Sequence, residues 1–112
     1  MSRHMKNTRT KSTGCPATQL DILGDECART ILVATSSGPR TAKELTARTD
    51  CSSATVYRRI NTLLESQLLA ECIRFEEDGS HTTAYEATVE RLRVDIDANG
   101  IDVALTETDE PT

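Results

Sequence analysis

The chain has 112 residues, a formal net charge of −5 and only three aromatic residues, with no Trp. This length fits one domain, whose core must come from Leu, Ile, Val and Ala. No apolar run approaches the roughly 20 residues of a membrane span and the N-terminus lacks the apolar stretch of a signal peptide, so a cytoplasmic protein is expected.

The charge is unevenly distributed along the chain. Residues 1–16 carry four cations and no acid, and residues 36–60 carry five cations against Glu44 and Asp50. The acid excess lies in residues 61–112. An overall negative charge argues against binding to nucleic acid, but the local positive charge keeps that class open.

The composition is rich in Arg and acids and poor in Lys, with 10 Arg, 3 Lys and 17 Thr. An acidic, Lys-poor surface is similar to that of proteins from salt-loving archaea. At 1 M salt the Debye length is about 3 Å, so acidic patches away from a contact would hardly repel DNA.

Residues 1–17 are polar and basic and predict a disordered arm, either a solvated tail or a segment that touches DNA. From residue 18 to about residue 36, apolar residues recur with helical spacing. Gly24 is a candidate kink in this helix, with Asp25 as the N-cap of its second piece.

Two short helices joined by a tight turn follow. Thr41 and Glu44 form a capping box that starts a helix ending near Arg48. Residues 49–51 form the turn, and Ser52 or Ser53 caps a helix that runs to about residue 67. This order is typical of a helix-turn-helix DNA-binding motif.

After this third helix the apolar period changes from 3.6 to 2 residues. Residues 69–76 and 81–88 are therefore predicted as the two strands of a hairpin, with residues 77–80 as the turn. This hairpin is in the position of the wing of a winged helix.

A second hairpin is predicted around Asn99-Gly100, a dipeptide strongly preferred in two-residue turns. With those two residues as the loop, Ile96 pairs with Val103 and Asp97 opposes Asp102. The domain is then expected to span residues 18–105, followed by an acidic tail at residues 106–112.

The third helix has two distinct sides when each residue is advanced by about 100°. Val56, Ile60, Leu63 and Leu64 share the inner side, and Arg58 lies opposite. Ser53, Thr55 and Arg58 are placed nearest the base edges, and Ser52, Ser53, Tyr57 and Arg59 nearest the phosphates. The full set of expected DNA-binding residues is Thr41, Lys43, Ser52, Ser53, Thr55, Tyr57, Arg58 and Arg59.

Residues 20–89 resemble a winged helix-turn-helix regulator of the arsenic-repressor-like (ArsR-like) type, and more narrowly small haloarchaeal regulators of that fold. The resemblance is carried by Leu23-Gly24-Asp25-Glu26, by residues 38–45 and by the Ser-x-Thr-Val-Tyr-Arg-Arg run at residues 53–59. It implies an α+β fold with three helices, a wing hairpin and an additional C-terminal β-hairpin. It also implies a transcription regulator that binds double-stranded DNA as a homodimer.

The chain departs from that family pattern in two places. Gln67 stands where such proteins often carry Gly after the third helix. The predicted wing turn is acidic, which leaves only Arg74 and His81 as candidates for wing contacts with DNA. The dimer surface is left open between the first helix and the last hairpin.

Other chemistries have weaker support. The four cysteines lack C-x-x-C spacing, so we expect free thiols and no metal site. No catalytic motif, cofactor site or small-molecule site is evident, and an enzyme is not expected. Two alternatives to DNA binding alone stay open: a protein-interaction winged helix without DNA binding, and a redox-responsive regulator that senses oxidation through Cys51.

Overall fold

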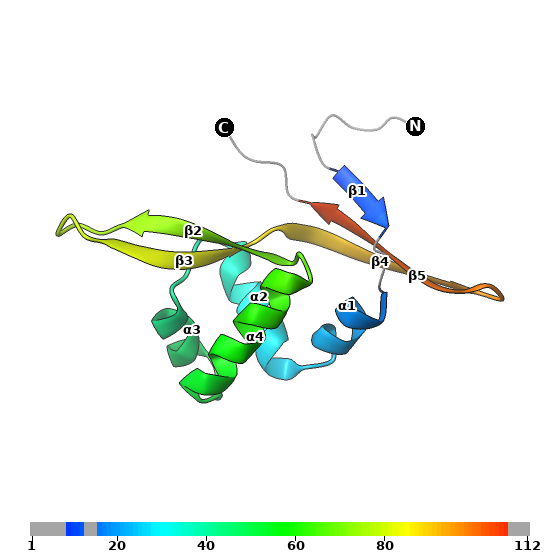
Figure 1. Ribbon diagram of the computed structural model, residues 1–112, viewed down its shortest axis with the longest axis horizontal. Coiled ribbons are helices and arrows are strands. Elements are labelled where there is room, and N and C mark those ends of the chain that lie inside the picture. Colours follow the sequence, from blue (N-terminus) through cyan, green and yellow to red (C-terminus); the bar gives the residue numbers. More distant parts are fainter. Residues whose placement is uncertain (1–8, 13–15, 108–112) are drawn as a thin grey trace.

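The computed structural model describes residues 9–12 and 16–107 (Figure 1). The helices are α1 (Pro16–Leu23), α2 (Glu26–Ser36), α3 (Ala42–Arg48) and α4 (Ser53–Glu65). The strands are β1 (Arg9–Ser12), β2 (Leu69–Phe75), β3 (His81–Ala87), β4 (Val89–Asp97) and β5 (Gly100–Glu107). The helices gather on one side of a long ribbon whose two hairpins point in opposite directions.

The described residues form four helices rather than the three expected, because the predicted first helix is divided into α1 and α2. The N–H of Gly24 bonds to the carbonyls of Leu20 and Asp21 at 3.1 and 3.2 Å and closes α1. Asp25 then begins α2, because its carboxylate accepts the N–H of Ala28 at 2.9 Å. The candidate kink at Gly24 is therefore a complete break, while the predicted cap at Asp25 is confirmed.

Both predicted N-caps of the helix pair are present. Thr41 Oγ1 accepts the N–H of Glu44 at 3.1 Å, and Glu44 Oε1 accepts the N–H of Thr41 at 3.0 Å. Ser52 rather than Ser53 caps α4, since its hydroxyl accepts the N–H of Thr55 at 3.1 Å. These local hydrogen bonds fix where α3 and α4 begin.

The end of α4 is sharp although it lacks glycine. Gln67 has a φ of 66°, in the left-handed region. The N–H of Leu68 reaches back to the carbonyl of Leu63 at 3.0 Å, and that of Gln67 to Leu64 at 3.2 Å. This is the Schellman arrangement, in which Gly usually occupies the left-handed position.

The first hairpin is confirmed, with β2 and β3 paired antiparallel from Leu69–Ala87 to Phe75–His81. Arg40 adds a short bridge on the other edge of β3, through two backbone hydrogen bonds with Tyr85 at 3.0 and 2.8 Å. This bridge ties the segment before α3 to the sheet.

The second hairpin is present, but its predicted register was wrong by two residues. Asp97 pairs with Gly100 and Ile96 with Ile101. The Asp97 carboxylate accepts the N–H of Asn99 at 2.8 Å, so the two-residue loop is Ala98-Asn99. Gly100, with a φ of 131°, is the first residue of β5. A shift of two keeps the apolar side chains on one face.

Residues 9–12 lie within the predicted disordered arm but form β1, which pairs with β5 and gives the sheet order β1-β5-β4. Residues 16 and 17 begin α1, so the arm is not unstructured there either. Residues 106 and 107, placed in the predicted tail, belong to β5. The remainder of the predicted arm and tail lies outside the described residues.

One residue, Thr88, separates β3 from β4. Its N–H donates to the carbonyl of Leu68 at 3.1 Å, and its hydroxyl donates to the carbonyl of Gln67 at 3.1 Å. The two hairpins therefore form one ribbon that is fastened to the end of α4.

The core lies between the helices and this ribbon. Its fully buried members include Ile31 of α2, Leu45 of α3, Ile60 and Leu63 of α4, Leu68 after α4, and Leu105 of β5. The inner side predicted for the third helix is thus confirmed. No described helix has the length and apolar character that crossing a membrane requires.

Candidate nucleic-acid interface

The side of α4 that faces away from the core is an open polar surface. We call it the outer face of α4, and it consists of Ser53, Ala54, Thr55, Tyr57, Arg58, Asn61 and Thr62. Tyr57 is 52% exposed, and Ser53, Arg58 and Asn61 are also exposed. Val56 and Ile60, on the inner side, are buried. Burial of the inner side therefore leaves the outer face free to meet a ligand.

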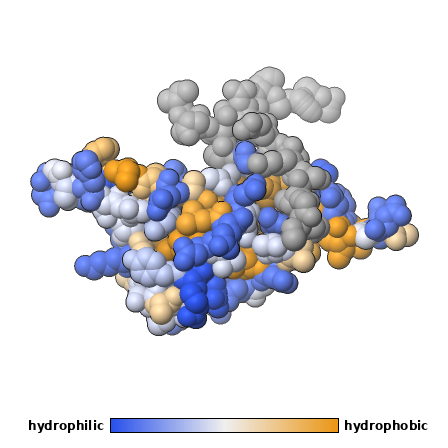
Figure 2. Space-filling model, viewed as in Figure 1, coloured by the Kyte–Doolittle hydropathy of each residue, from blue (hydrophilic) through white to orange (hydrophobic). Residues whose placement is uncertain are grey.

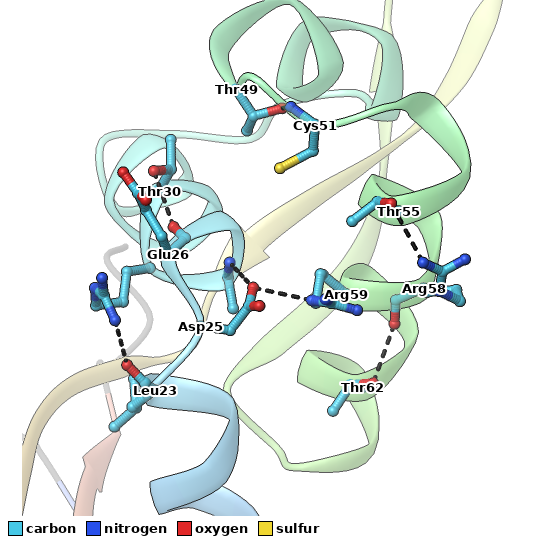
Figure 3. A network of polar contacts seen from close by, with 12 residues as sticks. Leu23, Asp25, Glu26, Thr30, Thr49, Cys51, Thr55, Arg58, Arg59 and Thr62 are labelled. Atoms are coloured by element: carbon cyan, nitrogen blue, oxygen red, sulfur yellow. Dashed lines mark hydrogen bonds and ion pairs between the residues drawn. The ribbon is translucent and has the colours of Figure 1, made fainter.

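Three of the predicted DNA-binding side chains meet at the first turns of α4. The Thr55 hydroxyl oxygen accepts a hydrogen bond from Ser52 Oγ at 3.1 Å and from Arg58 Nη2 at 3.3 Å. Figure 3 shows Arg58 directed away from the helix bundle, with Thr55 above it. This arrangement holds a guanidinium near the N-terminal half of the helix, the part that enters the major groove in helix-turn-helix proteins.

Arg59 differs from its neighbour. Its Nε donates to Asp25 Oδ2 at 2.9 Å, and its side chain is 29% exposed. It points toward the start of α2 in Figure 3, on the opposite side of α4 from Arg58. The predicted phosphate contact of Arg59 is not supported by this geometry, because the guanidinium is held by a carboxylate that also caps α2.

The predicted residues of α3 fall into two situations. The Thr41 hydroxyl is engaged in its helix cap, whereas Lys43 is exposed. Among the exposed side chains of residues 42–61, the cations are Lys43, Arg48 and Arg58, and the only acid is Asp50. The helix pair therefore presents a locally positive surface despite the net charge of the chain.

Arg48 was missing from the predicted site. It is exposed in the last turn of α3, directly before the turn that leads to α4. Its position in the charge pattern of residues 36–60 is the signal that could have identified it.

Arg74 and His81, the candidates for DNA contacts from the β2–β3 hairpin, interact with other residues of the same chain. Arg74 donates to both Glu44 carboxylate oxygens at 2.8 Å and to Glu76 Oε2 at 3.0 Å. The Arg74 guanidinium and the Thr41 N–H lower the pKa of Glu44 to about 2. His81 packs its ring edge-on against Phe75, with centroids 4.5 Å apart. Arg74 thus joins β2 to α3 rather than reaching outward.

Two thiols lie side by side where the turn between α3 and α4 meets α2. Cys27 of α2 is buried and Cys51 is half-buried. Burial and a hydrogen bond with the Cys51 side chain raise the pKa of Cys27 to about 12. Both cysteines line an open cavity of about 150 Å³ between α2 and the turn. Among the described residues, no three His, Cys, Asp or Glu side chains gather as a metal site would require.

Comparison with known proteins gives one match. Residues 23–72 match a family model described as a helix-turn-helix domain. The match extends over α2, α3 and α4 and into β2, so it includes the whole outer face of α4. No match was found among curated proteins or among solved structures. Residues 23–72 therefore form a helix-turn-helix domain, a motif typical of proteins that bind DNA and regulate transcription.

Proposed function

We propose that the protein is a sequence-specific regulator of transcription that binds double-stranded DNA as a homodimer. In this proposal it is a winged helix-turn-helix of the ArsR-like type, with α2, α3 and α4 as its three helices and β2–β3 as the wing. The single observation that carries the proposal is the exposed outer face of α4, with Arg58 at its centre, inside a matched helix-turn-helix domain.

Each side chain has a distinct expected role. Arg58 is suited to a bidentate contact with guanine O6 and N7, and Thr55 to a base edge or a thymine methyl group. Ser53 and Tyr57 are expected to contact phosphates, as are Lys43 and Arg48 on α3. The helix N-terminus at Ser52 adds a partial positive charge toward the backbone.

The composition supports a source with concentrated cytosolic salt, such as a haloarchaeon. High salt screens the 18 acidic residues of the chain. It equally weakens the phosphate contacts, because each counterion released on binding gains less entropy when the surrounding salt is already concentrated. Direct contacts from the outer face of α4 would then supply a larger share of the affinity.

The proposal is tested by selecting preferred duplexes from a random pool and measuring affinity by gel shift across salt concentrations. We expect affinity that falls as salt rises. Arg58→Ala should weaken binding to the preferred duplex by about 1–3 kcal/mol and relax the preference at one base pair. Arg59→Ala is the matched control, because it removes the same charge from a guanidinium that faces Asp25.

Equal effects of the two substitutions would contradict the assignment of Arg58. If the protein bound no duplex at any salt concentration, DNA binding itself would be contradicted. That result would favour the alternative of a winged helix that binds another protein, which the acidic β2–β3 turn at Glu76, Glu77 and Asp78 also favours.

A second candidate function, control of DNA binding by oxidation, is favoured by the contact between Cys27 and Cys51. Hydrogen peroxide would accept two electrons from the two thiols, giving one disulfide and two waters. The bond would fasten the turn before α4 to α2. Mild peroxide should then change the DNA affinity of the native chain but not that of Cys51→Ser. Unchanged affinity of the native chain would remove this candidate.

A further inference from the structure

The outer half of the β4–β5 hairpin carries apolar side chains that the molecule does not cover. Val94 is 42%, Ile96 73% and Ile101 47% exposed, whereas Val103 and Leu105 on the same face are buried. Figure 1 shows the hairpin projecting past α1, and Figure 2 shows hydrophobic surface just short of its tip. The apolar face therefore continues beyond the helices that bury its inner half.

The hairpin also has an open backbone edge. The sheet order is β1-β5-β4, so β4 is an edge strand and pairs on one side with β5. Nine residues make it a long edge strand. Such an edge presents unpaired N–H and C=O groups that another strand can use.

The sequence of β4 is self-complementary about Val94. Arg93 and Asp95 flank it, then Leu92 and Ile96, then Arg91 and Asp97. In an antiparallel pair of two such strands with Val94 at the centre, Arg93 opposes Asp95 of the other chain. Arg91 likewise opposes Asp97. Opposite charges at facing positions stabilise antiparallel pairs, whereas like charges destabilise them.

We propose that the β4 edge is the interface for a second copy of this chain, paired antiparallel across a two-fold axis at Val94. The proposal deepens the homodimer of the proposed function and rests on that part alone. It is isologous, because one strand supplies both halves of the contact. The two three-stranded sheets become one continuous sheet, and the β4 backbone groups near the axis that face away from β5 gain partners.

The exposed apolar side chains find cover in this arrangement. Val94 meets Val94 of the second copy. Ile96 lies beside Leu92 of that copy, which is half-buried and packs against its core. The tip of each hairpin thus reaches the base of the other, where the helices supply the apolar contacts that the lone tip lacks.

The charges on β4 favour pairing more than they guard against it. Edge strands are often protected by charges of one sign, which repel a second copy. Here the two signs occupy mirrored positions. The ion pair between Arg93 and Asp95 within one strand, at 3.0 Å, leaves both side chains more than half exposed. Exposed ion pairs of this kind contribute little to stability. Replacing the pair within one strand by pairs across the axis therefore costs little free energy.

The test uses charge reversal and sedimentation velocity on the full chain over a range of concentrations. Arg93→Asp puts acids at positions 93 and 95, and Asp95→Arg puts cations at both. Each variant alone should dissociate at least about tenfold more readily than the native chain, since like charges face each other. An equimolar mixture of the two should form heterodimers, and the double variant R93D/D95R should recover the native self-association.

Glu77→Arg in the β2–β3 turn is the charge-matched control for Asp95→Arg and should leave dimerisation unchanged. A native chain that stays monomeric overturns both the interface and the homodimer. A dimer that ignores the single variants, or single variants that fail to combine, overturns the β4 interface and points to another surface. DNA binding is scored separately by gel shift, so a chain that dimerises in this way but ignores DNA contradicts only the proposed function.

Discussion

The Asp25 carboxylate is shared between the first turn of α2 and the Arg59 guanidinium of α4. Its Oδ2 accepts the N–H of Ala28 and the Nε–H of Arg59, each at 2.9 Å. The Arg59 hydrogen bond, followed by the Ala28 hydrogen bond, lowers the pKa of Asp25, and Asp25 in turn raises the pKa of Arg59. One side chain therefore caps α2 and also links it to α4 on the side of α4 away from Arg58.

Two substitutions at Asp25 separate these roles. Asp25→Ser keeps a capping oxygen but loses the ion pair, and Asp25→Ala loses both. We expect Asp25→Ala to unfold at a lower urea concentration than Asp25→Ser. Its free energy of unfolding should be lower by about 1 kcal/mol, the usual contribution of an N-cap. The loss in Asp25→Ser should be smaller and should shrink as salt screens the pair. Equal stability of the two variants would contradict the capping role.

Glu44 predicts a pH dependence of stability. Its folded pKa of about 2 lies below the ordinary 4.5, so the unfolded chain binds the proton more tightly. The Glu44–Arg74 pair therefore stabilises the fold fully above pH 4.5, and this contribution is lost as the pH falls from 4.5 toward 2. Urea unfolding at about pH 6 and about pH 3 should show a smaller acid loss in Glu44→Gln than in the native chain.

The matched control for that experiment is Glu77→Gln, an exposed glutamate in the β2–β3 turn. Its acid loss should equal that of the native chain. If Glu44→Gln also keeps the native acid loss, the pair with Arg74 does not carry the dependence.

Gln67 holds left-handed backbone at the end of α4, which costs a residue with a side chain about 1–2 kcal/mol relative to glycine. Gln67→Gly should therefore stabilise the protein, by about 0.5–1 kcal/mol after the greater freedom of glycine in the unfolded chain is subtracted. Gln67→Ala removes the same polar group but keeps the strain and should not stabilise. Thermal unfolding of the three chains gives the comparison, and a gain in Gln67→Ala would contradict the backbone explanation.

Lys43 predicts a uniform effect on DNA binding, in contrast to Arg58. It is exposed on α3, and in the proposed complex it contacts a phosphate. Lys43→Ala should weaken binding to all duplexes alike and reduce the slope of log affinity against log salt by about 1. Gel shifts with preferred and scrambled duplexes at several salt concentrations measure both quantities. A change in base preference would show that Lys43 contacts an edge instead.

Features set by neighbouring residues were predictable from the sequence. The capping box of Thr41 and Glu44 and the cap at Asp25 depend on atoms three residues apart, and all are present. The face of each strand was also predictable, because alternation survives a shift of two residues. The register of the second hairpin was not, since the Asp97 side chain takes the N–H of Asn99 and moves the loop.

Features that depend on residues far apart in the sequence could not be predicted from the sequence pattern. The helical period placed Arg59 on the flank of α4, but only the tertiary fold brings Asp25 beside it, 34 residues away. In the same way, the polar sequence of residues 9–12 gives no sign of a strand, because its pairing with β5 uses backbone groups near the other end of the chain. The exposed face centred on Arg58 needed only the period, and the sequence was sufficient for it.

The ribbon formed by the two hairpins has a mechanical consequence through Thr88. Thr88, the one residue between β3 and β4, is hydrogen-bonded to Leu68 and Gln67, directly after α4. A torque applied to the outer hairpin, for example by pairing with another chain, is thus transmitted at Thr88 to the end of α4 and to the β2–β3 hairpin. Leverage of this kind would couple the angle between two chains to the tilt of their α4 helices.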